Sequence, residues 1–296
     1  MKTISTTKQL LLLTLCTVFF CSPLCHAQKN NSKVKGVQIG AITYSFRDMP
    51  DKSLEAILKY TVEAGLSSVE LMGGQVEQYA GIPRERDEVR GWRTSVSMDK
   101  FKEIKKMFNA QGVKIDILKL GDPGWTDEEI DYAFRVCKTL GARGISMEIS
   151  ENTAKRMAPF GKKHKLFVIM HNHGQPGDPN FSFERALEHG EYLRLNFDVG
   201  HYFGATGKNP ADLIKKLHKQ IASIHIKDKT GPDDTPKDSN MPLGEGKTPL
   251  GDIFSLIRDQ KYPITCDIEQ EYKVPEGSDQ VKEVRKCLEY CKKLLE

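Results

Sequence analysis

The sequence lacks the features that would place it in several specialised classes of protein. Its 44 basic and 40 acidic residues nearly cancel and leave a formal net charge of +4. A protein that binds nucleic acid, or that is held on a membrane surface by charge, usually has a large excess of basic residues, and this sequence does not. No Gly-x-Gly-x-x-Gly motif follows the first predicted strand, so a dinucleotide site of that kind is not indicated. Small molecules are therefore the favoured ligands.

Cysteine is scarce, and its spacing is not that of a zinc knot or a disulfide scaffold. Three of the seven cysteines, Cys16, Cys21 and Cys25, lie in the first 27 residues. The other four are Cys137, Cys266, Cys287 and Cys291. These four form no Cys-x-x-Cys pair and fall within predicted helices or a strand, so we expect buried free thiols. Two of them share a helical face, but that geometry suits a disulfide poorly.

Long apolar runs are also lacking, except near the amino terminus. Residues 10–20 are apolar and follow two lysines, Lys2 and Lys8, and Cys25-His26-Ala27 has the small-x-small pattern of a cleavage site. The run is short for a membrane span. We therefore interpret residues 1–27 as an export signal and residues 28–296 as the mature, periplasmic or secreted chain, which does not insert stably into the membrane after cleavage.

The mature chain shows no low-complexity linker, and its length suits one large domain. Short apolar runs alternate with amphipathic stretches from residue 35 onward. The predicted strands are 37–43, 67–72, 113–119, 142–148, 166–172, 192–198, 221–227 and 263–269. The predicted helices are 52–65, 97–111, 126–140, 151–164, 181–189, 210–219, 249–260 and 278–294. Capping residues Ser53, Thr126, Ser150 and Ser278 open several of these helices.

Eight strand–helix pairs in one domain predict a (β/α)8 barrel, with a doubly wound open sheet as the alternative. Two connections, 73–95 and 228–248, are longer than the others and rich in Gly, Pro and charged residues. In a barrel both of them would lie over the mouth at the carboxyl ends of the strands, where active sites are found.

Polar side chains recur with a period of two near the carboxyl ends of six predicted strands. In Tyr192–His201 (YLRLNFDVGH), for example, leucine and phenylalanine alternate with Arg194, Asn196 and Asp198. The corresponding polar positions near the ends of the other five strands include Glu70, Glu148, His171, His173, His225, Lys227, Asp267 and Glu269. Taken singly, Asp198 is compatible with a helix cap and His225 with a core histidine. Together they would place several buried charges at one barrel mouth, which is costly without a partner.

A bound divalent cation is the simplest partner for these groups. We predict one ion held by Glu148, Asp198, His225 and Glu269. Carboxylates combined with an imidazole suit Mn, Co, Mg or Zn.

The same residues carry a resemblance to a known family. Asp198-Val-Gly-His201, His225-Ile-Lys227-Asp228, the glutamate Glu269 near the end of the eighth strand and the opening Gly40-Ala-Ile-Thr-Tyr-Ser-Phe-Arg47 are similar to the xylose isomerase-like barrels. The resemblance is strongest to their sugar phosphate isomerase/epimerase branch and covers nearly the whole mature chain. It implies one cation held by Glu, Asp, His and Glu of successive late strands, and it assigns Asp198, His225 and Glu269 directly.

The chain departs from this pattern on the fifth strand. Where the family usually has a glutamate, often as Glu-Asn-His, this sequence has His171-Asn172-His173. Either His171 takes the ligand position, or Glu148 on the adjacent strand supplies the missing carboxylate. We favour Glu148, because without it the site has lost a negative charge.

The chemistry that this resemblance implies is proton transfer next to a carbonyl group of a carbohydrate. The candidate catalytic residues are Glu148, Glu269 and His173, and the candidate substrate-binding residues are Glu70, His171, His201 and Lys227. Lys227 faces inward two residues after His225, where it can steady an oxyanion, although a structural pairing with Asp198, Asp228 or Asp267 is equally compatible with its position.

We expect a metal-dependent sugar isomerase or epimerase. The first alternative is a 3-keto-glycoside lyase or hydratase, which abstracts the same kind of proton and expels an oxygen substituent; export favours glycans and free sugars as substrates. The second alternative is a non-catalytic sugar-binding protein. A nuclease is less favoured, because that branch of the superfamily needs further histidines and a basic face. The sequence is compatible with a homo-oligomer and does not establish one.

Overall fold

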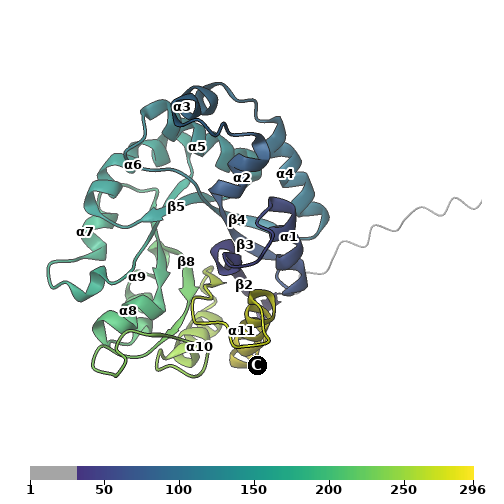
Figure 1. The fold of residues 1–296 in the computed structure, drawn as a ribbon. Helices are drawn as coiled ribbons and strands as arrows, with labels where there is room; N and C mark the ends of the chain where they lie inside the picture. Colours follow the sequence, from purple (N-terminus) through teal and green to yellow (C-terminus); the bar gives the residue numbers. More distant parts are fainter. Residues whose placement is uncertain (1–31) are drawn as a thin grey trace, which may run out of the picture.

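The computed structural model describes residues 32–296, so the predicted export signal lies outside the described residues. Eight parallel strands form a closed barrel, because β2 pairs with both β11 and β3 (Figure 1). The barrel strands are β2 (Val37–Ile42), β3 (Ser68–Met72), β4 (Lys114–Lys119), β5 (Gly144–Glu148), β6 (Phe167–His171), β7 (Leu193–Asp198), β8 (Ile221–Ile226) and β11 (Thr265–Ile268). The predicted (β/α)8 barrel is confirmed, and each strand lies within a predicted range.

Helices surround the barrel (Figure 1). They are α1 (Leu54–Glu63), α2 (Gly73–Ala80), α3 (Arg86–Ser95), α4 (Asp99–Ala110), α5 (Asp127–Leu140), α6 (Glu151–His164), α7 (Phe183–Leu187), α8 (Val199–Thr206), α9 (Pro210–Leu217), α10 (Leu250–Gln260) and α11 (Gln280–Leu295). Three short 3-10 turns are η1 (Thr43–Phe46), η2 (Gln175–Gly177) and η3 (His218–Gln220). No helix among residues 32–296 is long and apolar enough to cross a membrane.

The connection 73–95, in which we predicted no helix, contains α2 and α3. Another short helix, α8, follows β7 directly. The connection 228–248 contains a small antiparallel pair, β9 (Asp228–Lys229) and β10 (Asn240–Met241). A further short strand, β1 (Lys33–Val34), pairs with β2. Both long connections thus contain ordered secondary structure.

Helix caps explain where several of the predicted helices begin. Ser53, Thr126 and Ser150 cap α1, α5 and α6 as predicted, and Thr126 forms a reciprocal capping box with Glu129. For α11 the expected cap was wrong by one residue, because Asp279 accepts the hydrogen bond from the Lys282 amide. Ser278 instead donates a hydrogen bond to Glu283.

The main apolar core includes residues of the barrel strands and of the surrounding helices. Phe101, Phe108, Tyr132 and Phe134 from α4 and α5 are among its largest fully buried side chains. Ile117, Ile169 and Ala222 form a separate small cluster. Ile169 shares a strand face with His171 two residues later, so this apolar cluster precedes the polar groups of the mouth along β6.

Candidate metal centre

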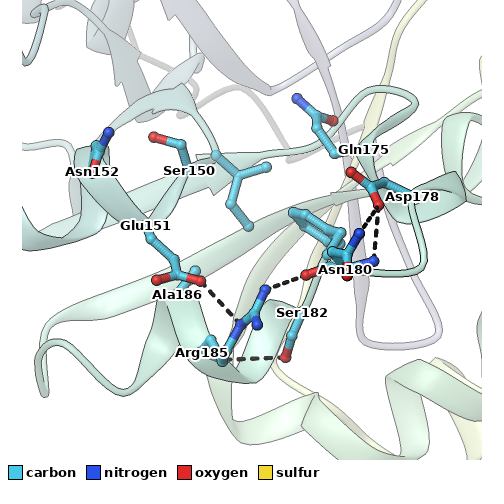
Figure 2. Close-up of a pocket in the computed structure, with 11 residues that line it drawn as sticks. Ser150, Glu151, Asn152, Gln175, Asp178, Asn180, Ser182, Arg185 and Ala186 are labelled. Atoms are coloured by element: carbon cyan, nitrogen blue, oxygen red, sulfur yellow. Dashed lines mark hydrogen bonds and ion pairs between the residues drawn. The ribbon is translucent and has the colours of Figure 1, made fainter.

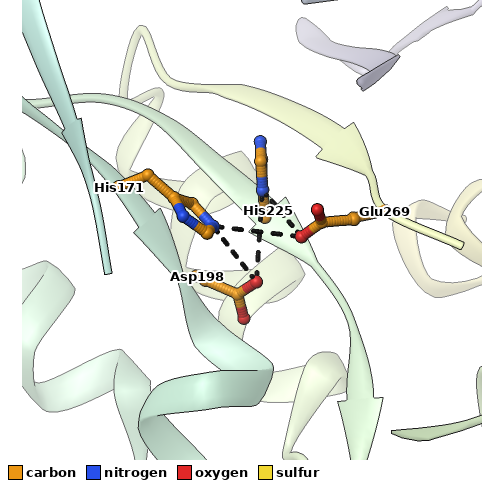
Figure 3. Close-up of side chains that lie close together, drawn as sticks. All are labelled: His171, Asp198, His225 and Glu269. Atoms are coloured by element: carbon orange, nitrogen blue, oxygen red, sulfur yellow. Dashed lines mark hydrogen bonds and ion pairs between the residues drawn. The ribbon is translucent and has the colours of Figure 1, made fainter. Parts of the chain in front are cut away.

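Four buried side chains meet at the carboxyl ends of β6, β7, β8 and β11. His171, Asp198, His225 and Glu269 each offer one nitrogen or oxygen atom, and these four atoms lie within 4.8 Å of one another (Figure 3). His225 Nδ1 is 3.0 Å from Glu269 Oε2, and His171 Nε2 is 3.5 Å from Asp198 Oδ2. Two imidazoles and two carboxylates can therefore converge on one small ion.

The polar atoms of this group fit a cation, because several of them are buried without a hydrogen-bond partner. Both ring nitrogens of His171 and the Oδ2 atom of Asp198 have no hydrogen-bond partner within residues 32–296. A buried polar atom without a partner costs about 1–3 kcal/mol, so such atoms are uncommon unless something else satisfies them. His171 Nε2 and Asp198 Oδ2 both point toward the other members of the group (Figure 3), where an ion would satisfy both.

The strand register brings these residues to one level. Asp198 of β7 pairs with His225 of β8, and Asp267 of β11 pairs with the same histidine. Glu269 follows β11 directly, and its amide donates to the carbonyl of Ile226. Neighbouring parallel strands thus end at a common rim, as the alternation of polar residues predicted.

Asp198 combines two roles that the sequence left as alternatives. Its Oδ1 accepts a 2.7 Å hydrogen bond from the His201 amide and so caps α8. Its Oδ2 lies toward His171 and Lys227. The helix cap therefore fixes the carboxylate in one orientation and leaves the other oxygen available to the centre.

His225 is held from behind by a carboxylate that a ligand above the mouth would not reach. Glu70 on β3 is completely buried, and its Oε2 lies 2.9 Å from His225 Nε2. Asn196 donates to the same oxygen at 2.7 Å, and Ser146 donates to the other one. Burial alone would raise the pKa of Glu70, but the charge and hydrogen bond of His225, together with Lys119 and Ser146, outweigh burial and lower that pKa to about 2. This contact leaves His225 Nδ1 for the centre.

Glu148, the expected fourth ligand, lies beside the buried group and outside it. Its carboxylate contacts His173 Nδ1 at 2.8 Å and Lys119 Nζ at 3.0 Å, while His171 Nδ1 is 3.6 Å away. The side chains of Glu148 and His173 are each 51% exposed. Glu148 and His171 are register partners on adjacent strands, and the histidine is the one that lies among the other three candidate ligands.

Lys227 and His201 line the other side of the group. The ammonium of Lys227 lies 2.9 Å from Glu269, 3.3 Å from Asp198 and 2.6 Å from Glu271. Lys227 therefore makes the structural pairing with Asp198 that its position in the sequence allowed, and it also pairs with two glutamates. His201 Nε2 is 2.9 Å from Lys227 Nζ, and Lys229 lies near its other nitrogen. Burial together with these two ammonium groups lowers the pKa of His201 to about 4, so the ring is neutral at neutral pH.

Opposite charges balance one another in the buried group. Burial would lower the pKa of His225, but Glu269 and Glu70 raise it well above its usual value. For His171 the contacts with Asp198 and Glu148 likewise outweigh burial and raise the pKa. Burial would raise the pKa values of Asp198 and Glu269, but Lys227 and the histidines hold both of them low. A cation that binds here must therefore displace protons from the histidines.

Sequence reasoning missed several members of this site. Asn196 joins Glu70 to His225, Glu271 pairs with Lys227, and Lys119 pairs with Glu148. Asn196 carried a usable signal, because it shares the inward face of β7 with Asp198. For Glu271, which lies beyond the end of β11, strand alternation gave no information.

Two cavities lie along loops that follow barrel strands. One, of about 370 Å³, lies between the start of α6 and the segment 175–186 (Figure 2). Its polar groups largely bond to one another: Arg185 pairs with Glu151, and Asp178 accepts from Asn180 (Figure 2). The other, of about 290 Å³, lies beside η1 and the start of α2.

The fold and this cluster define a (β/α)8 barrel with a possible metal centre at the carboxyl ends of its strands. Residues 58–294 match the model of the xylose isomerase-like TIM barrel family, so the chain belongs to that family.

Solved structures of this fold resemble the chain at low sequence identity. A sugar phosphate isomerase/epimerase from Parabacteroides distasonis is 19% identical with a TM-score of 0.58, over 86% of this chain and 93% of its own. A 3-keto-D-glucoside 4-epimerase from E. coli is 13% identical with a TM-score of 0.61, over 87% and 99%. A probable 3-DHS dehydratase from Bacillus anthracis is 16% identical with a TM-score of 0.61, over 85% and 98%. A comparison with curated protein sequences gives no significant match.

Proposed function

We propose that the protein is a divalent-metal-dependent enzyme that moves a proton next to a carbonyl group of a carbohydrate, as a sugar isomerase or epimerase. The observation that carries the proposal is the half-exposed Glu148–His173 pair beside the buried group of His171, Asp198, His225 and Glu269. A bound cation supplies polarisation of a carbonyl or hydroxyl oxygen, which acidifies the neighbouring C–H or O–H.

In this proposal His171 takes the fourth ligand position in place of Glu148. His171 is buried and has unpartnered nitrogens, whereas Glu148 is half exposed and already pairs with Lys119 and His173. Two nitrogens and two oxygens form a borderline site. Such a donor set favours Mn, Co or Zn over Mg, which prefers oxygen ligands.

Glu148 with His173 is the proposed proton carrier. Burial would raise the pKa of Glu148, but contacts with His171, His173 and Lys119 together hold it below its usual value, so the carboxylate is ionised at neutral pH. A carboxylate with so low a pKa is a weak base, so in this proposal it shares the transferred proton with His173. His173 contacts the same carboxylate and is exposed enough to pass that proton on to solvent or back to the substrate. Glu148 ends β5 and His173 lies two residues after the end of the adjacent strand β6, which places both on one side of the centre.

Lys227 and His201 are the proposed partners of the substrate oxygens. The pKa of Lys227 is lowered by burial but raised further by Asp198, Glu269 and Glu271, so it remains a cation that can stabilise a developing oxyanion. His201, neutral and next to Lys227, suits a hydrogen bond with a sugar hydroxyl. Glu70 is assigned to orienting His225 and not to the substrate, because it is fully buried.

A keto-sugar lyase is the second candidate. It needs the same proton removal and then the departure of an oxygen substituent, for which one exposed base is enough. The Glu148–His173 pair is such a base, and the likeness to a probable 3-DHS dehydratase supports this reading alongside the likenesses to an isomerase/epimerase and a keto-glucoside epimerase.

The test uses the metal-loaded protein with a panel of aldoses, ketoses, 3-keto-sugars and 3-keto-glycosides in D2O. We expect deuterium at the carbon next to the carbonyl group and a product of unchanged skeleton. Release of the aglycone instead would identify the lyase. If no member of the panel exchanges a proton or changes mass while sugars still bind, the protein is a binding protein and the proposal is wrong.

We also propose that the enzyme acts outside the cytoplasm. The support is the pattern of Lys2, Lys8, the apolar run 10–20 and Cys25-His26-Ala27. Amino-terminal sequencing of the protein from native cells should find a chain that begins near Gln28. An intact Met1 in the cytosol would refute export and would favour sugar phosphates as substrates.

A further inference from the structure

The cavity beside η1 has the composition of a sugar-binding subsite. Tyr44, Arg47, Lys52, Gln75 and Gln78 line it, and we call it the Tyr44 cavity. At about 290 Å³ it is near the lower end of the roughly 300–1,000 Å³ found for small-molecule sites.

Tyr44 gives this cavity an exposed aromatic surface. Tyr44 is 39% exposed, and among residues 32–296 it is the most exposed large apolar residue. The guanidinium of Arg47 lies 4.9 Å from its ring centroid and helps to hold the ring in place. An aromatic face carries partial negative charge and attracts the weakly positive C–H groups on the face of a pyranose.

Gln75 gives the cavity an unused hydrogen-bond acceptor. Its Oε1 is buried and has no hydrogen-bond partner among the described residues. Such an atom costs free energy unless a ligand or water satisfies it. A sugar hydroxyl is a donor of the right kind, and Gln78 and Lys52 line the same cavity with further donors.

The Tyr44 turn is bonded directly to the segment that carries Glu269. Ser45 Oγ donates to the carbonyl of Ile268 at 3.2 Å and accepts from the Gln270 amide at 3.0 Å. Arg47 donates to the carbonyl of Gln270 at 2.6 Å. The residues on both sides of a candidate metal ligand are therefore held by the turn that lines the cavity, so the cavity and the centre lie at the same rim of the barrel.

We propose that the Tyr44 cavity binds a second pyranose ring, linked to the one held at the candidate metal centre, so that the substrate is a glycoside of at least two rings. The ring stacks on Tyr44 and donates a hydroxyl to Gln75. The identity of the first ring's site rests on the proposed function, whereas stacking at Tyr44 does not. The cavity in Figure 2 fits this role less well, because Arg185 and Asp178 there already have partners.

The test is calorimetric binding of glucose, maltose, cellobiose and p-nitrophenyl glucoside to the Mn-loaded protein. Tyr44→Ala removes the stacking surface. Gly74→Leu fills the cavity from α2, where a Cβ meets nothing within 4 Å. Asn152→Ala, in the cavity of Figure 2, is the matched control.

We expect a disaccharide to bind more tightly than glucose, and both test variants to reduce that preference about fivefold, the size of one stacking contact. Asn152→Ala should keep the preference. Absence of disaccharide binding, or a preference unchanged in both test variants, would overturn the subsite. If p-nitrophenyl glucoside alone binds more tightly than glucose, the subsite would also be overturned, since the cavity would then select an aromatic aglycone.

The same measurements separate this inference from the proposed function. A Tyr44-dependent disaccharide preference in a protein that holds no metal and turns nothing over would support the subsite and refute the enzyme. Metal-dependent turnover with no effect of Tyr44→Ala on disaccharide affinity would support the enzyme and refute the subsite.

Discussion

At the scale of single residues, the fourth ligand is the main question, because Glu148 and His171 are register partners on adjacent strands. The sequence placed both near the mouth and favoured the carboxylate for its charge. Side-chain alternation tells which face a residue takes, but not how far its donor atom reaches or what it meets there. His171 reaches the other three candidate ligands, and Glu148 meets Lys119 and His173 first.

Three variants test this assignment. His171→Ala should lose the metal, because it removes one of four donors. Glu148→Gln should keep most of the metal and lose turnover by about 10²-fold or more, as expected for a general base. Glu269→Gln is the control and should lose both. Metal content by elemental analysis and turnover are measured side by side, and loss of metal in Glu148→Gln with retention in His171→Ala would restore Glu148 as the ligand.

At the scale of elements, the eight barrel strands were predictable, whereas three short strands and three helices were not. Each barrel strand shows a short apolar run or strict alternation, which comes directly from burial on its two faces. Helix α3 has no buried residue and therefore no apolar stripe to detect. Helices α2 and α8 contain two glycines each, which lowers helix propensity, so tertiary packing decides their conformation.

A pair of glycine substitutions tests how tightly the barrel interior is packed. A Cβ on Gly40 of β2 would lie 2.2 Å from Asp267 Oδ1 and 2.9 Å from the carbonyl of Ser68. Gly40→Ala should therefore lower the free energy of unfolding by about 1–3 kcal/mol or more. Gly91→Ala in α3, where a Cβ meets nothing within 4 Å, should instead raise it by about 0.5–1 kcal/mol. Urea unfolding measures both, and equal effects would contradict the close packing at Gly40.

The cysteines provide a second test at this scale. All four in the described chain are free and buried, and burial raises the pKa of each thiol. In a chain that begins near Gln28, we expect none of these four to react with a thiol reagent at neutral pH until the protein unfolds, and all four to react in denaturant, because the thiolate is the reactive form. Rapid reaction of the native protein would show that a helix carrying Cys137, Cys287 or Cys291 opens readily.

At the scale of the whole molecule, a bound ion should stabilise the fold, because the four donors converge only when β6, β7, β8 and β11 are paired in the folded protein. In the absence of metal, His171 and His225 have raised pKa values, so their contribution to stability is present below their unfolded pKa and is lost as the pH rises through the folded value. Metal binding needs both rings neutral and therefore strengthens with pH.

The melting temperature gained on adding Mn, Co or Zn should accordingly be larger at about pH 8.5 than at about pH 6. Differential scanning calorimetry of chelated and metal-loaded protein at the two pH values measures it. As a matched control, the His171→Ala variant should show a much smaller gain in melting temperature at both pH values. An equal gain in that variant would mean that the stabilising ion binds elsewhere.

The order of the strands along the chain also bears on how the protein acquires an ion. The four candidate ligands lie between residues 171 and 269, and β11, the last barrel strand to be synthesised, must pair with β8 before Glu269 reaches its neighbours. A chain that is still emerging from the ribosome, or crossing a membrane unfolded, cannot yet form the site. The compartment in which β11 joins β8 thus sets the pool of ions from which the centre is filled, and local abundance there selects among metals of similar affinity.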